Sequence, residues 1–200
     1  MTNDPSAGWD AVAGRFMAVR SDVGADLVRS WARRCLPPAS DILDIGCGSG
    51  VPIARALASE GFTVHGVDAS PALVAAFRRH LPGMPAACET AQDSRFFDRT
   101  FAAAVSIGLI FLLDEGDQRR LLANVARVLE PGGRFLFSAP REACRWSDTL
   151  TGRPSMSLGA AAYAAHLAEL GLTLTRCYSD EGGNTYHEAI RPAVADAAGH

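Results

Sequence analysis

The sequence has few of the features that mark membrane, secreted or nucleic-acid-binding proteins. No uninterrupted apolar run approaches the roughly 20 residues that a transmembrane helix needs. The N-terminus, MTNDPSAGWD, lacks the basic and then apolar pattern of a signal peptide. The formal net charge is −3, and the 19 basic residues are scattered along the chain rather than clustered. Composition therefore argues against a membrane or nucleic-acid partner and favours small-molecule ligands.

Cysteine is also sparse, and its spacing excludes two further classes of protein. The five cysteines are widely separated, with no C-x-x-C pair: Cys35, Cys47, Cys88, Cys144 and Cys177. This pattern predicts neither a disulfide framework nor a zinc site, and we expect no bound metal. A chain of 200 residues that is 48% hydrophobic is long enough to bury one core. We expect one domain in the reducing cytoplasm, as a monomer or a homodimer.

Hydrophobic periodicity divides the chain into an N-terminal part and a longer α/β part. Charges at helical intervals over residues 8–36 predict two short helices, which end before Pro37. From residue 39, strand and helix patterns alternate, as in linked βαβ units. We expect strands at residues 41–45, 62–67, 86–89, 101–107, 134–139, 172–178 and 185–190, and helices at 51–60, 71–81, 117–129 and 159–170.

These patterns predict four regions with different roles. Residues 1–38 form an N-terminal helical cover, and residues 39–191 form the main domain. Within it, residues 140–158 lack periodicity over a length that exceeds ordinary α/β connections, which favours a lid or substrate loop. Residues 192–200 are expected to fray.

The stretch DILDIGCGSGVP, residues 41–52, places three glycines directly after the first strand. In an open parallel sheet, ligands bind outside the carboxyl ends of the strands, and glycines let a ligand lie against bare backbone. The second strand is followed by Asp68, whose carboxylate can accept hydrogen bonds from ribose hydroxyls. The spacing is G-x-G-x-G, whereas a dinucleotide pyrophosphate site has G-x-G-x-x-G. An adenosine-type cofactor is therefore expected, with NAD as the less favoured candidate.

Three strings in this order carry a family resemblance: D-I-L-D-I-G-C-G-S-G, V-H-G-V-D-A-S-P and V-L-E-P-G-G-R-F-L-F-S-A-P. Over roughly residues 40–140 they resemble the motifs of class I S-adenosylmethionine-dependent methyltransferases, and residues 141–190 resemble small bacterial members whose substrates are mostly unassigned. The resemblance implies a Rossmann-like α/β fold. Its mostly parallel seven-stranded sheet has the order 3-2-1-4-5-7-6, the last strand antiparallel, and helices on both faces.

The resemblance also implies a cofactor, S-adenosylmethionine, and a reaction, in-line displacement of its methyl group onto a small-molecule acceptor, which leaves S-adenosylhomocysteine. Residues implied to face the methionine moiety are Asp44, Gly46, Cys47, Gly48 and Gly50; those near ribose and adenine are Asp68, Ala69, Thr90 and Ala91; and Ser106 underlies the sulfonium. Arg20 is a further candidate, because a guanidinium grips a carboxylate bidentately. Cys47 is interpreted as a small residue that fills the turn, since no His or Lys is nearby in sequence to lower its pKa.

The acceptor side is less determined by the sequence. Candidate catalytic residues are His187, Asp148 and Tyr163, and candidate acceptor contacts are Trp9, Phe16 and Trp146. Each has a structural alternative: a histidine within a strand is often structural, an aspartate often begins a turn, and tryptophans are often core anchors. The family's common acidic residue is replaced by Ala102, and a frequent histidine by Leu112 or Leu113. Two other functions stay open, a nicotinamide-dependent oxidoreductase and a cofactor-binding domain without catalysis.

Overall fold

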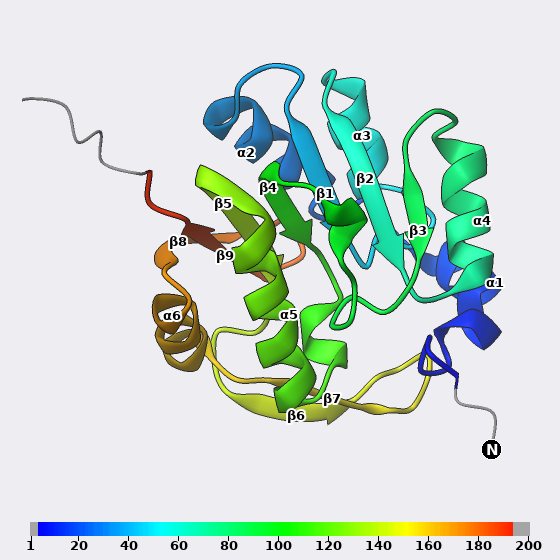
Figure 1. Cartoon of the computed structure of the whole chain (residues 1–200). Coiled ribbons are helices and arrows are strands. Elements are labelled where there is room, and N and C mark those ends of the chain that lie inside the picture. Colours follow the sequence, from blue (N-terminus) through cyan, green and yellow to red (C-terminus); the bar gives the residue numbers. More distant parts are fainter. Residues whose placement is uncertain (1–3, 194–200) are drawn as a thin grey trace, which may run out of the picture.

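A computed structural model describes residues 4–193, which form a twisted sheet with helices on both faces (Figure 1). The seven strands of the sheet lie in the order β3-β2-β1-β4-β5-β9-β8. Their bounds are β1 Asp41–Ile45, β2 Thr63–Asp68, β3 Ala86–Cys88, β4 Phe101–Ser106, β5 Leu129–Ser138, β8 Thr173–Ser179 and β9 Thr185–Ile190. Counted within the sheet, this order is 3-2-1-4-5-7-6, and β9 is antiparallel to both neighbours. The predicted fold class is confirmed.

The central strands are buried on both faces because helices cover both. In β1, four of the five residues are buried, and β1 pairs in parallel with β2 and β4. A strand that is covered on both sides needs apolar residues at successive positions, which explains the near-continuous run in this segment.

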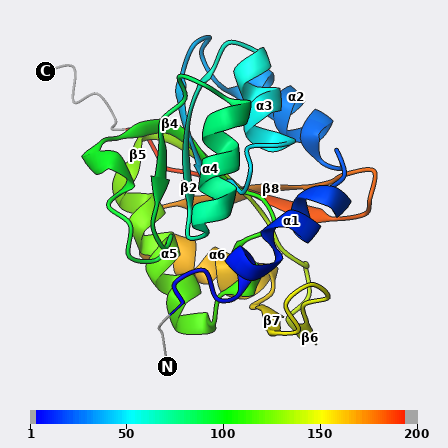
Figure 2. The same cartoon turned by 90° about the vertical axis from the view of Figure 1, so that its right-hand side faces the viewer.

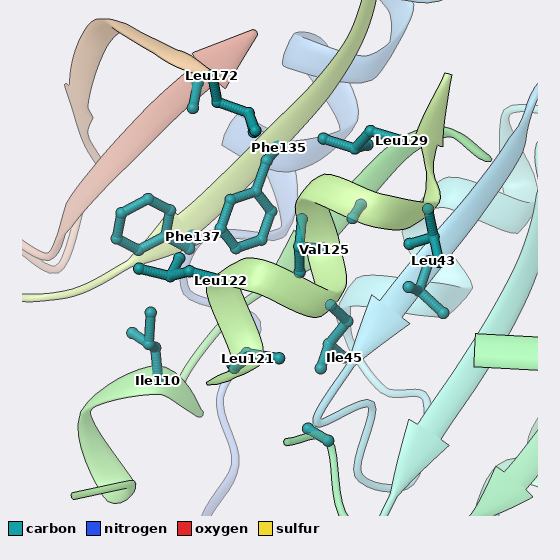
Figure 3. Close-up of a cluster of buried hydrophobic side chains, with 14 of the residues drawn as sticks. Leu43, Ile45, Ile110, Leu121, Leu122, Val125, Leu129, Phe135, Phe137 and Leu172 are labelled. Carbon is teal, nitrogen blue, oxygen red and sulfur yellow. The ribbon is translucent and has the colours of Figure 1, made fainter. Parts of the chain in front are cut away.

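Helices α2 (Ala25–Cys35), α3 (Ile53–Ser59) and α4 (Pro71–His80) pack on one face, where Trp31, Leu57 and Phe77 share a hydrophobic cluster. Helices α5 (Glu115–Val128) and α6 (Ala160–Glu169) cover the other face. Figure 3 shows the helical stripe of α5, with Leu121, Leu122 and Val125 turned toward side chains of β1 and β5. Within residues 4–193, no helix is long and apolar enough to cross a bilayer.

Local capping fixes where two of these helices begin. The Ser70 hydroxyl accepts a hydrogen bond from the Leu73 N–H at 3.2 Å, and Pro71 occupies the first helical position of α4, as the sequence predicted. Helix α5 begins two residues before its predicted start, because the Asp114 carboxylate accepts from the Asp117 N–H at 2.8 Å.

The N-terminal part forms α1 (Trp9–Val19) and α2, in agreement with the two helices predicted there. Two single turns, η1 (Phe96–Asp98) and η2 (Ile110–Leu112), flank β4. Residues 140–158, expected to lack regular structure, contain an antiparallel hairpin of β6 (Cys144–Ser147) and β7 (Pro154–Ser157). The first three residues of the expected cover, and residues 194–200 of the expected frayed tail, lie outside the described residues.

Candidate cofactor site

The carboxyl ends of the parallel strands open onto a cavity of about 430 Å³, here called the main cavity. In Figure 1 the arrowheads of β2 and β4 point toward the β6–β7 hairpin, and Figure 2 shows α1 beside α4. The residues that line the main cavity come from strand ends, the N-terminal segment, the β4–α5 connection and the hairpin. They are Pro5, Ser6, Ala7, Trp9, Phe16, Arg20, Gly46, Gly48, Asp68, Ala69, Leu73, Thr90, Ala91, Gln92, Ile107, Gly108, Leu109, Leu112, Leu113, Asp114, Asp117, Arg153 and Pro154. The cavity thus lies where the sheet topology predicts a ligand site.

The glycines after β1 differ in what they accommodate. Gly46 and Gly48 both line the main cavity and have left-handed φ values of 74° and 54°. A Cβ at Gly46 would lie 2.7 Å from Leu109 Cβ, and one at Gly48 would lie 3.2 Å from the Phe16 ring. A Cβ at Gly50 would lie 2.8 Å from the Phe77 ring and 2.9 Å from Leu81. Gly46 and Gly48 are therefore packed against Leu109 and Phe16, two residues of the cavity lining, whereas Gly50 is packed against α4 and the residue that follows it.

The amide groups of this loop are already engaged within the protein. The N–H groups of Gly46 and Cys47 donate to the Val67 carbonyl oxygen at 2.8 and 3.1 Å. The Gly50 N–H donates to the Cys47 carbonyl oxygen at 2.9 Å, and the Gly48 N–H to Asp68 Oδ2 at 2.9 Å. These four donors are not free to cradle a phosphate group, which is how a glycine loop holds a dinucleotide.

Asp44 is a buried carboxylate with an unused acceptor. Its side chain lies in β1, the residue is 2% exposed, and Oδ2 has no hydrogen-bond partner among residues 4–193. Burial and the nearby charge of Asp68 raise the pKa of Asp44 to about 7, although the charge of Arg20 acts in the opposite direction. A buried acceptor without a donor is costly, so a positively charged donor from a ligand would be favoured here.

Asp44 borders a second cavity of about 30 Å³, here called the side cavity. Cys47 and Arg20 also line it, and Arg20 lines the main cavity as well. Cys47 is 8% exposed, and burial raises the pKa of its thiol well above the usual value. A protonated, packed thiol supports the interpretation of Cys47 as a residue that fills the turn.

Asp68 stands at the carboxyl end of β2, beside the loop. Besides Gly48, it accepts a hydrogen bond from the Ser70 N–H at 2.9 Å, through Oδ1. Burial raises the pKa of Asp68, while the hydrogen bonds from Ser70 and Gly48 lower it. A carboxylate oxygen can accept a second hydrogen bond, so both oxygens keep capacity for ligand hydroxyls. Ala69, Thr90 and Ala91 line the cavity with it.

Ser106, expected beneath the sulfonium, is absent from the described lining of both cavities. The residue is fully buried, and its Oγ lacks a partner among residues 4–193. In the sheet register Ser106 lies opposite Phe137, which belongs to the α5 face. The next residue, Ile107, does line the main cavity.

The three candidate catalytic residues have their polar groups engaged elsewhere, and none is among the described residues that line the cavities. His187 is fully buried, with Nε2 3.1 Å from the Ala139 carbonyl oxygen, and burial lowers its pKa. Tyr163 donates its hydroxyl to Gln118 Oε1 at 2.8 Å, and burial raises its pKa. Asp148 Oδ1 accepts from the Leu150 and Thr151 N–H groups at 3.0 and 2.7 Å, which makes it a turn residue of the hairpin.

Of the acceptor contacts expected from the sequence, Trp9 and Phe16 line the main cavity, whereas Trp146 packs against Phe111 with ring centroids 5.4 Å apart. Sequence reasoning missed Arg153 and the polar residues after β4, Asp114 and Asp117. The two aspartates follow a strand whose carboxyl end faces the site, and that position was a usable signal. Arg153 had no such signal, because its place depends on the hairpin.

Part of the chain matches a known family model. Residues 42–133 match the family model described as "Methyltransferase domain". All of β1 except Asp41, all of β2, the glycine loop and Asp68 fall within the matched residues.

Curated relatives match about half of the chain. The carboxy-S-adenosyl-L-methionine synthases of Yersinia enterocolitica and Yersinia pestis are each 34% identical over 121 residues. That match covers 56% of this chain and 45% of the Yersinia proteins, so the chain spans about half the length of these relatives.

Solved structures share the fold of this chain at low identity. The glycopeptide N-methyltransferase MtfA, complexed with S-adenosyl-L-homocysteine, has a TM-score of 0.70 at 20% identity and covers 90% of this chain and 96% of its own. A putative methyltransferase in complex with the Haloferax volcanii activator Trm112 has a TM-score of 0.76 at 18% identity, with coverage of 96% and 99%. CalS10, an amino pentose methyltransferase from Micromonospora echinaspora with bound SAM, has a TM-score of 0.70 at 19% identity, with coverage of 90% and 95%.

Proposed function

We propose that this protein binds S-adenosylmethionine and transfers its methyl group to a small-molecule acceptor, releasing S-adenosylhomocysteine. The observation that carries the proposal is the buried Asp44 carboxylate, whose Oδ2 has no partner among residues 4–193 and which borders the side cavity together with Gly46 and Gly48. Asp68 at the adjacent strand end adds a second carboxylate, placed to accept hydroxyl groups. The methyltransferase domain over residues 42–133 supports the same function.

The residues present suit the parts of this cofactor. Asp44 would hold the amino group, which supplies the donor that Oδ2 lacks. Arg20, on the border of both cavities, would hold the carboxylate, and Asp68 the ribose hydroxyls. Thr90 and Ala91 would border the adenine. When bound, the cofactor supplies an electrophilic methyl group on its sulfonium.

The chain itself has to position the acceptor and exclude water. Much of the remaining lining suits exclusion of water, because it is apolar: Trp9, Phe16, Leu109, Leu112 and Leu113. Since the polar groups of His187 and Tyr163 are engaged within the core, we assign no proton-removing role to either residue.

The proposal includes a small-molecule acceptor and a cytoplasmic location. The solved neighbours include methyltransferases of a glycopeptide, an amino pentose and 1,6-didemethyltoxoflavin, which supports an acceptor of modest size. The five free cysteines support a reducing compartment.

The nicotinamide alternative is disfavoured by the loop. Four of its N–H groups donate to the protein itself, so they offer no cradle for a pyrophosphate.

The Yersinia relatives raise a different point, because their name gives a product other than a methylated acceptor. Binding of the cofactor alone would therefore not establish methyl transfer.

The test combines binding and turnover. Titration calorimetry is expected to show binding of S-adenosylhomocysteine in about the micromolar range, and no binding of NAD. Metabolite pools incubated with methyl-labelled S-adenosylmethionine should yield a labelled acceptor with the wild-type protein and not with Asp68→Ala. If the protein bound NAD but did not bind S-adenosylhomocysteine, the proposal would be refuted. Cofactor binding with no labelled product from any pool would refute catalysis.

A further inference from the structure

Residues 4–20, here called the α1 segment, form one wall of the main cavity. They comprise a turn at residues 4–8, helix α1 and Arg20. Six of them line the cavity: Pro5, Ser6, Ala7, Trp9, Phe16 and Arg20. A ligand held by Asp68 and the glycine loop would therefore be covered by this segment.

The α1 segment has little hydrophobic anchorage. Within α1 only Ala13 is buried, and Val19 is 61% exposed. Helix α2, of the same length, buries Val28, Trp31 and Ala32. Burial of one alanine methyl group contributes roughly 1 kcal/mol or less, and the other apolar contacts of α1 come from half-buried side chains, among them Trp9 and Phe16.

A polar contact joins α1 to the strand end that carries Asp68. Asp10 Oδ1 accepts the Ser70 hydroxyl at 2.6 Å and the Ala72 N–H at 2.8 Å. Ser70 in turn donates its N–H to Asp68. The contact therefore runs from α1 through the first turn of α4 to the carboxylate proposed to hold the ribose.

From this geometry we infer that Asp10 is a positioning residue, which holds the α1 segment closed over the cavity and so retains the nucleoside. The inference rests on the proposed function. The charged side chain of Asp10 accepts a hydrogen bond from the Ala72 N–H at the start of α4, where negative charge is stabilised. It also accepts a short hydrogen bond from the Ser70 hydroxyl. The hydrogen bonds also lower the pKa of Asp10, with Ser70 as the largest contributor, so the carboxylate is ionised at neutral pH.

The experiment compares Asp10→Ala with Asp26→Ala, the same change in the first turn of α2, where Asp26 pairs with Arg29 on the surface. Hydrogen–deuterium exchange of the ligand-free protein should become faster in residues 9–19 for Asp10→Ala alone. Stopped-flow displacement should show that S-adenosylhomocysteine dissociates about tenfold faster from Asp10→Ala. Asp10→Asn should lie between it and the wild type, because an amide oxygen can still accept both bonds.

Two outcomes would overturn the inference. One is unchanged exchange in residues 9–19 of Asp10→Ala. The other is faster exchange with an unchanged rate of dissociation, because the α1 segment would then not retain the ligand. If the wild-type protein bound no S-adenosylhomocysteine, the proposed function would fail, and the exchange data alone would decide whether Asp10 holds the α1 segment.

Discussion

Asp44 gives the most specific quantitative prediction, because its buried carboxyl has a pKa of about 7 against an ordinary value of 3.8. The unfolded chain ionises this group near pH 4, whereas the folded protein resists ionisation until about pH 7. Its contribution to stability is therefore fully present below about pH 4 and is lost as the pH rises through 7. Asp44→Asn removes this dependence while keeping a similar shape.

The magnitude follows from the two pKa values. Between pH 5 and pH 8, the wild type should lose about 2 to 3 kcal/mol of unfolding free energy relative to Asp44→Asn. Urea unfolding at the two pH values measures this difference, and the comparison between the proteins cancels the other titrating groups. Equal pH dependence in the two proteins would refute the reasoning that Asp44 is buried without a donor.

The same group should make cofactor binding depend on pH. If the amino group of S-adenosylhomocysteine pairs with ionised Asp44, affinity should fall as the pH drops below about 7, by up to about tenfold per unit. Calorimetry at pH 5.5, 6.5 and 7.5 should show this trend in the wild type and a flat profile in Asp44→Asn. A flat wild-type profile would place the amino group elsewhere.

Three further changes test other parts of the site and the fold. Asp68→Ala should weaken calorimetric binding of S-adenosylhomocysteine by about 1.5 to 3 kcal/mol, the usual worth of a hydrogen bond to a charged group; unchanged affinity would mean that Asp68 does not hold the ribose. Gly48→Ala should reduce this affinity more than Gly83→Ala, because both glycines have positive φ but a Cβ at Gly48 would lie 3.2 Å from Phe16 in the cavity lining, whereas a Cβ at Gly83 would have no atom within 4 Å among the described residues; equal effects would contradict a role of the packed loop in binding. Glu188→Gln should lower the unfolding free energy by about 2 to 3 kcal/mol near pH 7 in urea titrations, and the difference should shrink as the pH falls below about 4.

The last prediction follows from the surroundings of Glu188, which is 1% exposed. Burial would raise its pKa, but hydrogen bonds from Tyr178, Trp31 and Arg134 together hold the pKa below its usual value. A group with a lowered pKa stabilises the folded state above its unfolded pKa, and this contribution is lost as the pH falls through the folded value. A difference that stays constant down to pH 3 would contradict this account.

The sequence predicted the sheet well because its signals are local. The strand at residues 41–45 and the final strand at residues 185–190 have the predicted bounds, since apolar runs between turn residues decide them. Gly46, Gly48 and Asp68 lie at the cavity because strand ends in a parallel sheet converge on one edge.

The remaining parts depend on long-range contacts that a linear pattern does not reveal. The hairpin strands CRWS and PSMS are four residues long and lack clear alternation, and one begins with a proline. The hydrogen bonds that engage His187 and Tyr163 could not be foreseen from the sequence, because their partners, Ala139 and Gln118, are 48 and 45 residues away. Asp10 and Ser70, 60 residues apart, illustrate the same limit.

The most direct test of the central claim is a crystal structure of the wild-type protein with S-adenosylhomocysteine. We expect the ribose beside Asp68, the amino group within hydrogen-bond distance of Asp44, and the nucleoside covered by the α1 segment. A nucleoside bound away from the carboxyl ends of β1 and β2 would contradict the account.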